Sequence, residues 1–293
     1  MKKSLATACA AVVTAGVTLV AVGASAAPAV PAVASISPAR LSAAGGTPVT
    51  ITGSNFTGVT AVKIGGSDAT EVTVVSATKI TAVAPAGSNG NAAVAVTSSA
   101  GTSGARNVIY RTPLGIAASG GLVVKALGGP LTLEITGGTI GATARDYAAE
   151  RITVKMGRSV LKSAYVDSTH LTVTMPGLAA EEAQITVEHD TVPGAPATVD
   201  LAPVVSSLSA KEDTVVGGKT VTVKVAGANI AGATGFTFGG VPADCEAKGT
   251  GMATTFACVV PPATEAGPVW VAFTSAAGTP SRFTTAATFN YTD

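Results

Sequence analysis

The sequence predicts an all-β protein of three tandem β-sandwich domains preceded by a signal peptide. Short runs rich in valine and threonine alternate with turns of glycine, asparagine and proline, as in sheets with two faces. The chain contains 34 glycines and 16 prolines among 293 residues. Blocks of sequence also recur at spacings close to the size of a domain, so three small cores explain this length better than one large core.

The first 26 residues have the features of a secretory signal peptide. A basic start with Lys2 and Lys3 precedes an apolar run over residues 5–22, and Ala24 and Ala26 provide the small residues of a cleavage site. The alternative, a membrane anchor, fits less well because the run is interrupted by glycine and has no basic residue directly after it. We expect export to the cell exterior or cell surface, with no membrane span in the mature chain.

The charge balance argues against nucleic acid as a partner. The full sequence has 18 basic and 17 acidic residues, and two lysines leave with the signal peptide. A nearly neutral mature chain lacks the positive surface that binds phosphate backbones.

Internal repeats define the expected domains. Pro31–Ser37 recurs as Pro203–Ser209, and Gly45-Gly46 recurs as Gly217-Gly218 at the same spacing. These matches identify a first and a third copy of one unit. We place the domains at residues 27–111, 112–200 and 201–293, after the signal peptide at 1–26.

The middle domain is a more divergent copy. Val75–Pro85 matches Val166–Pro176, and Gly128-Gly129 takes the place of the first glycine pair. The two matches have different spacings, which predicts an insertion near residues 142–151. Prolines near residues 113 and 203 restrict the expected linkers, so we expect a semi-rigid rod.

The opening block of the first unit resembles a known family. Gly45–Phe56 reads as a glycine turn, a short strand and a Gly-Ser-Asn turn before an aromatic ring, and Val62–Gly66 follows. This block is similar to the opening hairpin of an IPT/TIG domain. The resemblance implies an immunoglobulin-like β-sandwich, as found in receptors, bacterial surface proteins, some polysaccharide enzymes and certain transcription factors. It implies no particular activity, and the neutral charge and signal peptide disfavour DNA binding.

Two cysteines remain after the signal peptide and its Cys9 are removed. Cys245 and Cys258 flank a segment whose centre, Gly249-Thr250-Gly251, predicts a hairpin turn that would bring them together. An even count in an exported protein favours a disulfide. A redox pair or a metal site is the weaker alternative, and zinc in particular needs four ligands.

The two histidines do not suggest a catalytic or metal site. His170 takes the place of Lys79 in the first unit, so we expect it to face solvent. His189, within Glu188-His189-Asp190, is expected at a solvated strand end, where contact with a cation is the less favoured alternative. Several carboxylates lie in the middle domain, but the Asp-x-Asp-x-Asp spacing of a calcium loop is absent. No serine-hydrolase, phosphate-loop or zinc-protease motif is present. We therefore expect no enzyme activity, cofactor or metal.

Trp270 is the one tryptophan and the candidate contact residue. It alternates with Val269 and Val271, so its side chain should point away from the core. It could pack on its own domain or the preceding one, contact another protein, or stack on a sugar. An exposed platform formed with nearby tyrosines would favour the sugar.

These observations predict an exported, non-enzymatic structural or adhesive surface protein. It would act through contact with other protein subunits or cell-surface polymers, or through self-association. The alternative is a carbohydrate-binding accessory protein.

Overall fold

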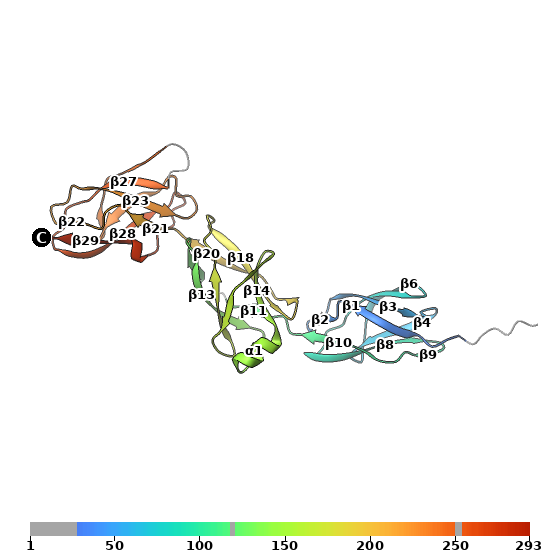
Figure 1. The fold of residues 1–293 in the computed structure, drawn as a ribbon. Helices are drawn as coiled ribbons and strands as arrows, with labels where there is room; N and C mark the ends of the chain where they lie inside the picture. Colours follow the sequence, from blue (N-terminus) through green and yellow to red (C-terminus); the bar gives the residue numbers. More distant parts are fainter. Residues whose placement is uncertain (1–27, 118–120, 250–253) are drawn as a thin grey trace, which may run out of the picture.

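The computed structural model describes residues 28–117, 121–249 and 254–293 and arranges them as three β-sandwiches in a row (Figure 1). The predicted signal peptide lies outside the described residues. Each sandwich pairs a four-stranded sheet with a second sheet of five or six strands. The described part adds one α-helix and one 3-10 helix, so the all-β fold class is confirmed.

The first domain contains β1 to β10. Its four-stranded sheet has the order β1 (Ala32–Ser37), β3 (Pro48–Ser54), β7 (Lys79–Val83) and β6 (Thr70–Ser76). The second sheet has the order β2 (Arg40–Ser42), β10 (Arg106–Arg111), β8 (Gly90–Ser98), β4 (Val59–Ile64) and β5 (Ser67–Asp68), and β9 (Gly101–Thr102) pairs with β8.

The second domain repeats this order from β11 to β20. Its smaller sheet runs β11 (Gly115–Ile116), β13 (Gly129–Thr136), β17 (His170–Met175) and β16 (Ser163–Tyr165). The larger runs β12 (Leu122–Lys125), β20 (Ala197–Ala202), β18 (Glu182–His189), β14 (Ile152–Met156) and β15 (Ser159–Leu161), with β19 (Val192–Pro193) beside β18.

The third domain contains β21 to β29. One sheet has the order β21 (Val204–Leu208), β23 (Thr220–Ala226), β27 (Thr255–Val259) and β26 (Cys245–Ala247). The other has the order β22 (Glu212–Thr214), β29 (Thr288–Thr292), β28 (Gly267–Thr274), β24 (Thr234–Phe238) and β25 (Val241–Pro242). A 3-10 helix, η1 (Thr285–Ala287), precedes β29.

Most strand pairs are antiparallel, and one pair in each domain is parallel. The parallel pairs are β2 with β10, β12 with β20, and β22 with β29. In every case an early strand of the domain lies beside its last strand. Each domain is thus closed by hydrogen bonds between its two ends.

Each domain has its own hydrophobic core. In the third domain, alternate residues of the strands point inward, and Val221, Val223, Phe256 and Cys258 are all buried in one cluster with Phe273. The first and second domains form separate clusters of buried side chains. The chain therefore folds around three separate small cores, one in each domain.

The repeated glycine pairs occupy equivalent turns. Gly45, Gly128 and Gly217 have positive φ angles of 80°, 81° and 71°. A Cβ atom at Gly45 would lie 2.7 Å from the backbone nitrogen of Ala86, so the turn needs both the left-handed conformation and the missing side chain. The glycines recur because the geometry of this turn recurs.

The insertion predicted in the second domain forms α1 (Ala144–Glu150). Thr143 caps the helix by accepting a hydrogen bond from the backbone nitrogen of Asp146. Tyr147 of the helix packs 5.8 Å from the Tyr165 ring and lies 2.7 Å from the Ser163 hydroxyl. Since both partners belong to the edge strand β16, the insertion covers that edge.

Candidate contact surface

Trp270 lies on β28 and forms an exposed aromatic pair with Phe283. Trp270 is 41% exposed and Phe283 is 47% exposed. Their ring centroids are 5.9 Å apart in an edge-to-face arrangement. The neighbouring Val271 is buried, which agrees with the outward direction expected from alternation along the strand.

The tyrosine of the third domain does not join Trp270 in an exposed platform. Tyr291, the tyrosine of the third domain, is buried at 2% exposure, and its hydroxyl donates to the Pro261 carbonyl at 2.7 Å. Tyr291 alternates with outward-facing residues on β29, so its ring points into the core. Phe283, which the sequence analysis did not identify, takes the position beside Trp270.

Phe283 is exposed because two buried hydroxyl residues fix the chain on either side of it. The Ser281 hydroxyl accepts a hydrogen bond from the Phe273 backbone nitrogen at 2.9 Å. The Thr284 hydroxyl donates to the Val205 carbonyl at 2.7 Å. With Ser281 and Thr284 anchored, the intervening Arg282 and Phe283 face outward.

Neither sister domain has an aromatic residue at these two positions. Trp270 pairs with Thr288, and the equivalent strand pairs place Ala93 and Gln184 at its position. Ser281 is equivalent to Ser103 by its hydrogen bonds. Counted from that serine, Phe283 falls at Ala105, and the segment from Ser281 to Thr288 is longer than the segment from Ser103 to Asn107. The fold does not require this aromatic pair, and a comparison of the repeats could have identified Phe283 as an addition of the third domain.

The aromatic pair lies next to the joint between the second and third domains. β20 ends at Ala202 and β21 begins at Val204, so Pro203 alone separates them. A hollow of about 510 Å³ at this joint is lined by residues of both domains, among them Glu181, Asp200 and Arg282. The Asn229 side chain of the third domain donates to the Glu181 carboxylate of the second.

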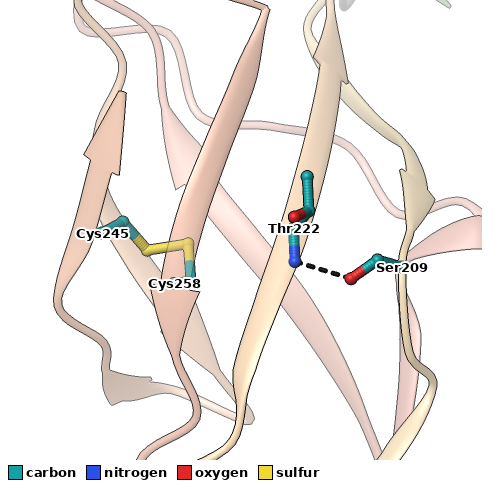
Figure 2. Close-up of a disulfide and its surroundings, with 4 residues drawn as sticks. All are labelled: Ser209, Thr222, Cys245 and Cys258. Atoms are coloured by element: carbon teal, nitrogen blue, oxygen red, sulfur yellow. Dashed lines mark hydrogen bonds between the residues drawn. A yellow bond between two sulfur atoms is a disulfide. The ribbon is translucent and has the colours of Figure 1, made fainter. Parts of the chain in front are cut away.

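Cys245 and Cys258 are bonded to each other in the structure (Figure 2). They face each other as a register pair of the antiparallel strands β26 and β27. Toward the opposite edge of the same sheet, Thr222 of β23 donates its backbone N–H to the hydroxyl of Ser209, which directly follows β21, at 2.8 Å. The disulfide ties edge strand β26 to its neighbour, and part of the hairpin tip expected at 249–251 lies outside the described residues.

His189 is buried, so the expectation of a solvated strand end is wrong. It is 3% exposed and lies at the joint between the first and second domains. Its Nδ1 donates to the Thr112 carbonyl at 3.1 Å, and its Nε2 lies 2.8 Å from a Glu150 carboxylate oxygen. The linker residue Thr112 and Glu150 of α1 satisfy both ring nitrogens, so the imidazole is buried in place of being solvated.

Asp190 is the centre of a charged cluster at the same joint. Its carboxylate lies 2.7 Å from Arg40, 3.5 Å from Arg111 and 3.7 Å from Arg151. Burial alone would raise the pKa of Asp190, but the hydrogen bond from Arg40 and the charges of the three arginines lower it below its usual value. Arg40 and Arg111 come from the first domain, so Asp190 links the two domains electrostatically.

His170 is partly exposed and stabilises a local turn. Its Nδ1 lies 2.9 Å from Asp167, which also accepts hydrogen bonds from the backbone nitrogens of Thr169 and His170 at 2.8 Å. The backbone bond from Thr169, with help from His170, lowers the pKa of Asp167 to about 2. Because Thr169 and Asp167 contact the same ring nitrogen, the group has no relay from an acid through the ring to a nucleophile.

Among the residues that the structure describes, no group of three or more histidine, cysteine, aspartate or glutamate side chains is placed to hold a metal ion. Within the same residues, no helix is long and apolar enough to cross a membrane. The surface with the most distinctive chemistry is thus the aromatic pair and the hollow beside it.

Comparison with known families identifies the first domain. Residues 31–110 match the family model described as the IPT/TIG domain. The chain therefore carries an IPT/TIG domain of the immunoglobulin-like class, and the resemblance seen in Gly45–Phe56 is confirmed. No curated protein matches the chain.

The solved structures that match this chain include a plexin extracellular region and two bacterial proteins. The plexin A4 extracellular region has 16% identity and a TM-score of 0.32, covering 91% of this chain and 25% of its own. Invasin, a bacterial integrin-binding protein, has 11% identity and a TM-score of 0.29, covering 89% and 60%. A Bacteroides ovatus SGBP-B in complex with a mixed-linkage heptasaccharide has 16% identity and a TM-score of 0.26, covering 86% and 64%. This chain spans a quarter of the plexin and under two thirds of the other two, and scores this low carry no functional inference.

Proposed function

We propose that this is an exported surface protein that works by contact and not by catalysis. The aromatic pair Trp270–Phe283 carries the proposal, because two large apolar side chains are left in solvent at positions where the sister domains have small or polar residues. Exposed aromatic residues of this kind are typical of binding surfaces.

The rest of the molecule supports this proposal. The three sandwiches are joined by short connections, so they can hold the aromatic pair of the third domain away from the first domain. The disulfide between Cys245 and Cys258 suits an oxidising exterior, as the predicted signal peptide does. The sequence is close to neutral, with a formal net charge of +1, so little repulsion opposes association with a partner or another copy.

The test uses the mature chain from residue 27 and a Trp270→Ala variant. The first domain has alanine, Ala93, at the position equivalent to Trp270, so the fold of the third domain should tolerate Trp270→Ala. We expect the parent protein to bind the cells that produce it or to self-associate in sedimentation experiments, and Trp270→Ala to weaken either behaviour about tenfold or more.

Val259→Ala is the matched control. Val259 is 44% exposed on the other sheet of the same domain, so this change also removes exposed apolar surface. A protein that stays monomeric at high concentration, binds neither cells nor wall polymers and turns over a polysaccharide would contradict the proposal and favour an enzyme.

A further inference from the structure

Three adjoining hollows form one groove beside the joint of the second and third domains. The first, about 410 Å³, is bounded by Trp270, Phe283 and Thr288. The second, about 320 Å³, shares Phe283 and extends to Val123 and Arg282. The third, about 510 Å³, shares Val123 and Arg282 and continues to Glu181, Glu182, Asp200 and Ser275. We call this continuous surface the junction groove.

The walls of the junction groove are held in place by hydrogen bonds at the linker, within the second domain and across the joint. The Arg282 backbone nitrogen donates to the Pro203 carbonyl at 2.8 Å, and the Leu201 nitrogen donates to the Glu181 carbonyl at 2.7 Å. The Asn229 side chain adds a hydrogen bond from the third domain to Glu181. A groove fixed in this way needs little rearrangement to receive a ligand.

The two ends of the groove have different chemistry. At one end, Trp270 and Phe283 offer ring surfaces beside the Thr288 hydroxyl. At the other end are the carboxylates of Glu181, Glu182 and Asp200 together with the Arg282 guanidinium. Within the described part of the chain, neither Asp200 nor Arg282 belongs to an ion pair, so both charged groups can bind a ligand.

This combination matches the chemistry of a sugar chain. The C–H faces of a pyranose ring pack on aromatic rings, while its hydroxyl pairs donate to carboxylates and accept from a guanidinium. The three carboxylates outnumber the two cations that line the groove, Arg282 and Lys125, so the groove has a net negative charge that disfavours a nucleic acid or an anionic polymer. A protein partner would require a broad apolar core with few charges, which the polar end does not provide. Concave surfaces at domain interfaces are typical sites for smaller ligands.

We propose that the junction groove binds a neutral polysaccharide chain that lies from Trp270 across Phe283 and Arg282 to Asp200. This inference rests on the proposed function, since it names the chemical class of the partner. It also adds Arg282, Phe283 and Asp200 as ligand-contacting residues.

The first experiment is affinity electrophoresis of the mature chain in native gels. Separate gels contain a soluble α-glucan, a soluble β-glucan, a galactomannan or, as the anionic comparison, polygalacturonate. We expect at least one neutral polysaccharide to retard the protein, with polygalacturonate having no effect. Trp270→Ala and Phe283→Ala should each weaken that retardation about tenfold or more.

The polar end is tested by Asp200→Asn and Arg282→Ala, with Val259→Ala as the control. Loss of a charged hydrogen-bonding group should weaken binding about tenfold, while Val259→Ala should bind like the parent. No retardation by any neutral polysaccharide would overturn the proposal. Retardation that is unaffected by both Asp200→Asn and Arg282→Ala would also overturn it, because the chain would not follow the groove.

A second experiment separates failure of this inference from failure of the proposed function. Cells that bind the protein are treated with periodate, which oxidises sugar diols, or with protease. The inference predicts that periodate removes binding and protease does not. The opposite result, with binding still dependent on Trp270, would overturn the polysaccharide and leave the contact function intact. Absence of both cell binding and self-association would refute the contact function itself.

Discussion

Replacing Asp190 by asparagine tests whether the charged cluster holds the first and second domains together. Asp190 is 4% exposed and has a positive φ of 46°. Asparagine tolerates that conformation well, so Asp190→Asn removes the negative charge without adding backbone strain. The variant leaves Arg40 and Arg111 without their shared carboxylate partner.

The expected loss is about 2 kcal/mol. Removing one partner of a buried ion pair typically costs 3–5 kcal/mol, and the lower figure reflects the solvent exposure of Arg40 and Arg151, whose side chains are 30% and 69% exposed. For domains of this size, about 2 kcal/mol corresponds to a fall in Tm of roughly 8–16 °C. The effect of Asp190 should also disappear in acid. Its folded pKa is below its ordinary value of 3.8, so its stabilisation is present above that pH and is lost as the pH falls through the folded pKa.

Two observables resolve the domains. Calorimetry of the mature chain reports all three, whereas tryptophan fluorescence reports only the third, because Trp270 is the one tryptophan. We expect Asp190→Asn to lower the calorimetric transitions of the first two domains and to leave the fluorescence midpoint unchanged. The control is Asp68→Asn, which breaks the exposed pair with Lys63 and should change stability by less than about 0.5 kcal/mol. Equal effects of Asp190→Asn and Asp68→Asn would refute a structural role for the cluster.

Three further predictions concern the rest of the chain. Reduction of the Cys245–Cys258 bond should lower the stability of the third domain by about 3 kcal/mol, seen as a shift in the tryptophan fluorescence midpoint with urea, while the first two domains keep their calorimetric transitions; free thiols in protein collected from the medium would contradict the bond. Asp167 should titrate with a pKa of about 2 by NMR, so that its contribution is lost only as the pH falls through that value, and His170→Ala should raise this pKa. N-terminal sequencing of exported protein should begin at Ala27, whereas recovery of the full-length chain from membranes would favour an anchor.

Much of the fold was accessible from the sequence because it depends on local rules. Glycine turns and alternating apolar residues are short-range signals, and they repeat in all three domains. The insertion in the second domain was placed correctly from the change in spacing near residues 142–151. Its helical form was not foreseen, because Ala144–Glu150 buries none of its residues and has no apolar periodicity to read.

The burial of His189 and the position of Phe283 could not be predicted from the sequence. The burial of His189 depends on Thr112 and Glu150, which are 77 and 39 positions away along the chain, so the Glu188-His189-Asp190 segment alone does not reveal it. Phe283 lies beside Trp270 because hydrogen bonds of Ser281 and Thr284 place its segment there, thirteen positions along the chain from the tryptophan. Long-range contacts of this kind require the three-dimensional structure.

The parallel strand pairs have a consequence for mechanical load. A pull along the molecule would act on the two ends of each domain, and these ends are joined by β2 with β10, β12 with β20, and β22 with β29. Strands paired in parallel near opposite ends of a domain are loaded in shear, so their hydrogen bonds must break together and not one after another. In the third domain the disulfide would also prevent the segment between Cys245 and Cys258 from extending after the sheets separate. Under the proposed function, a stretching force on the molecule would thus leave the junction groove intact.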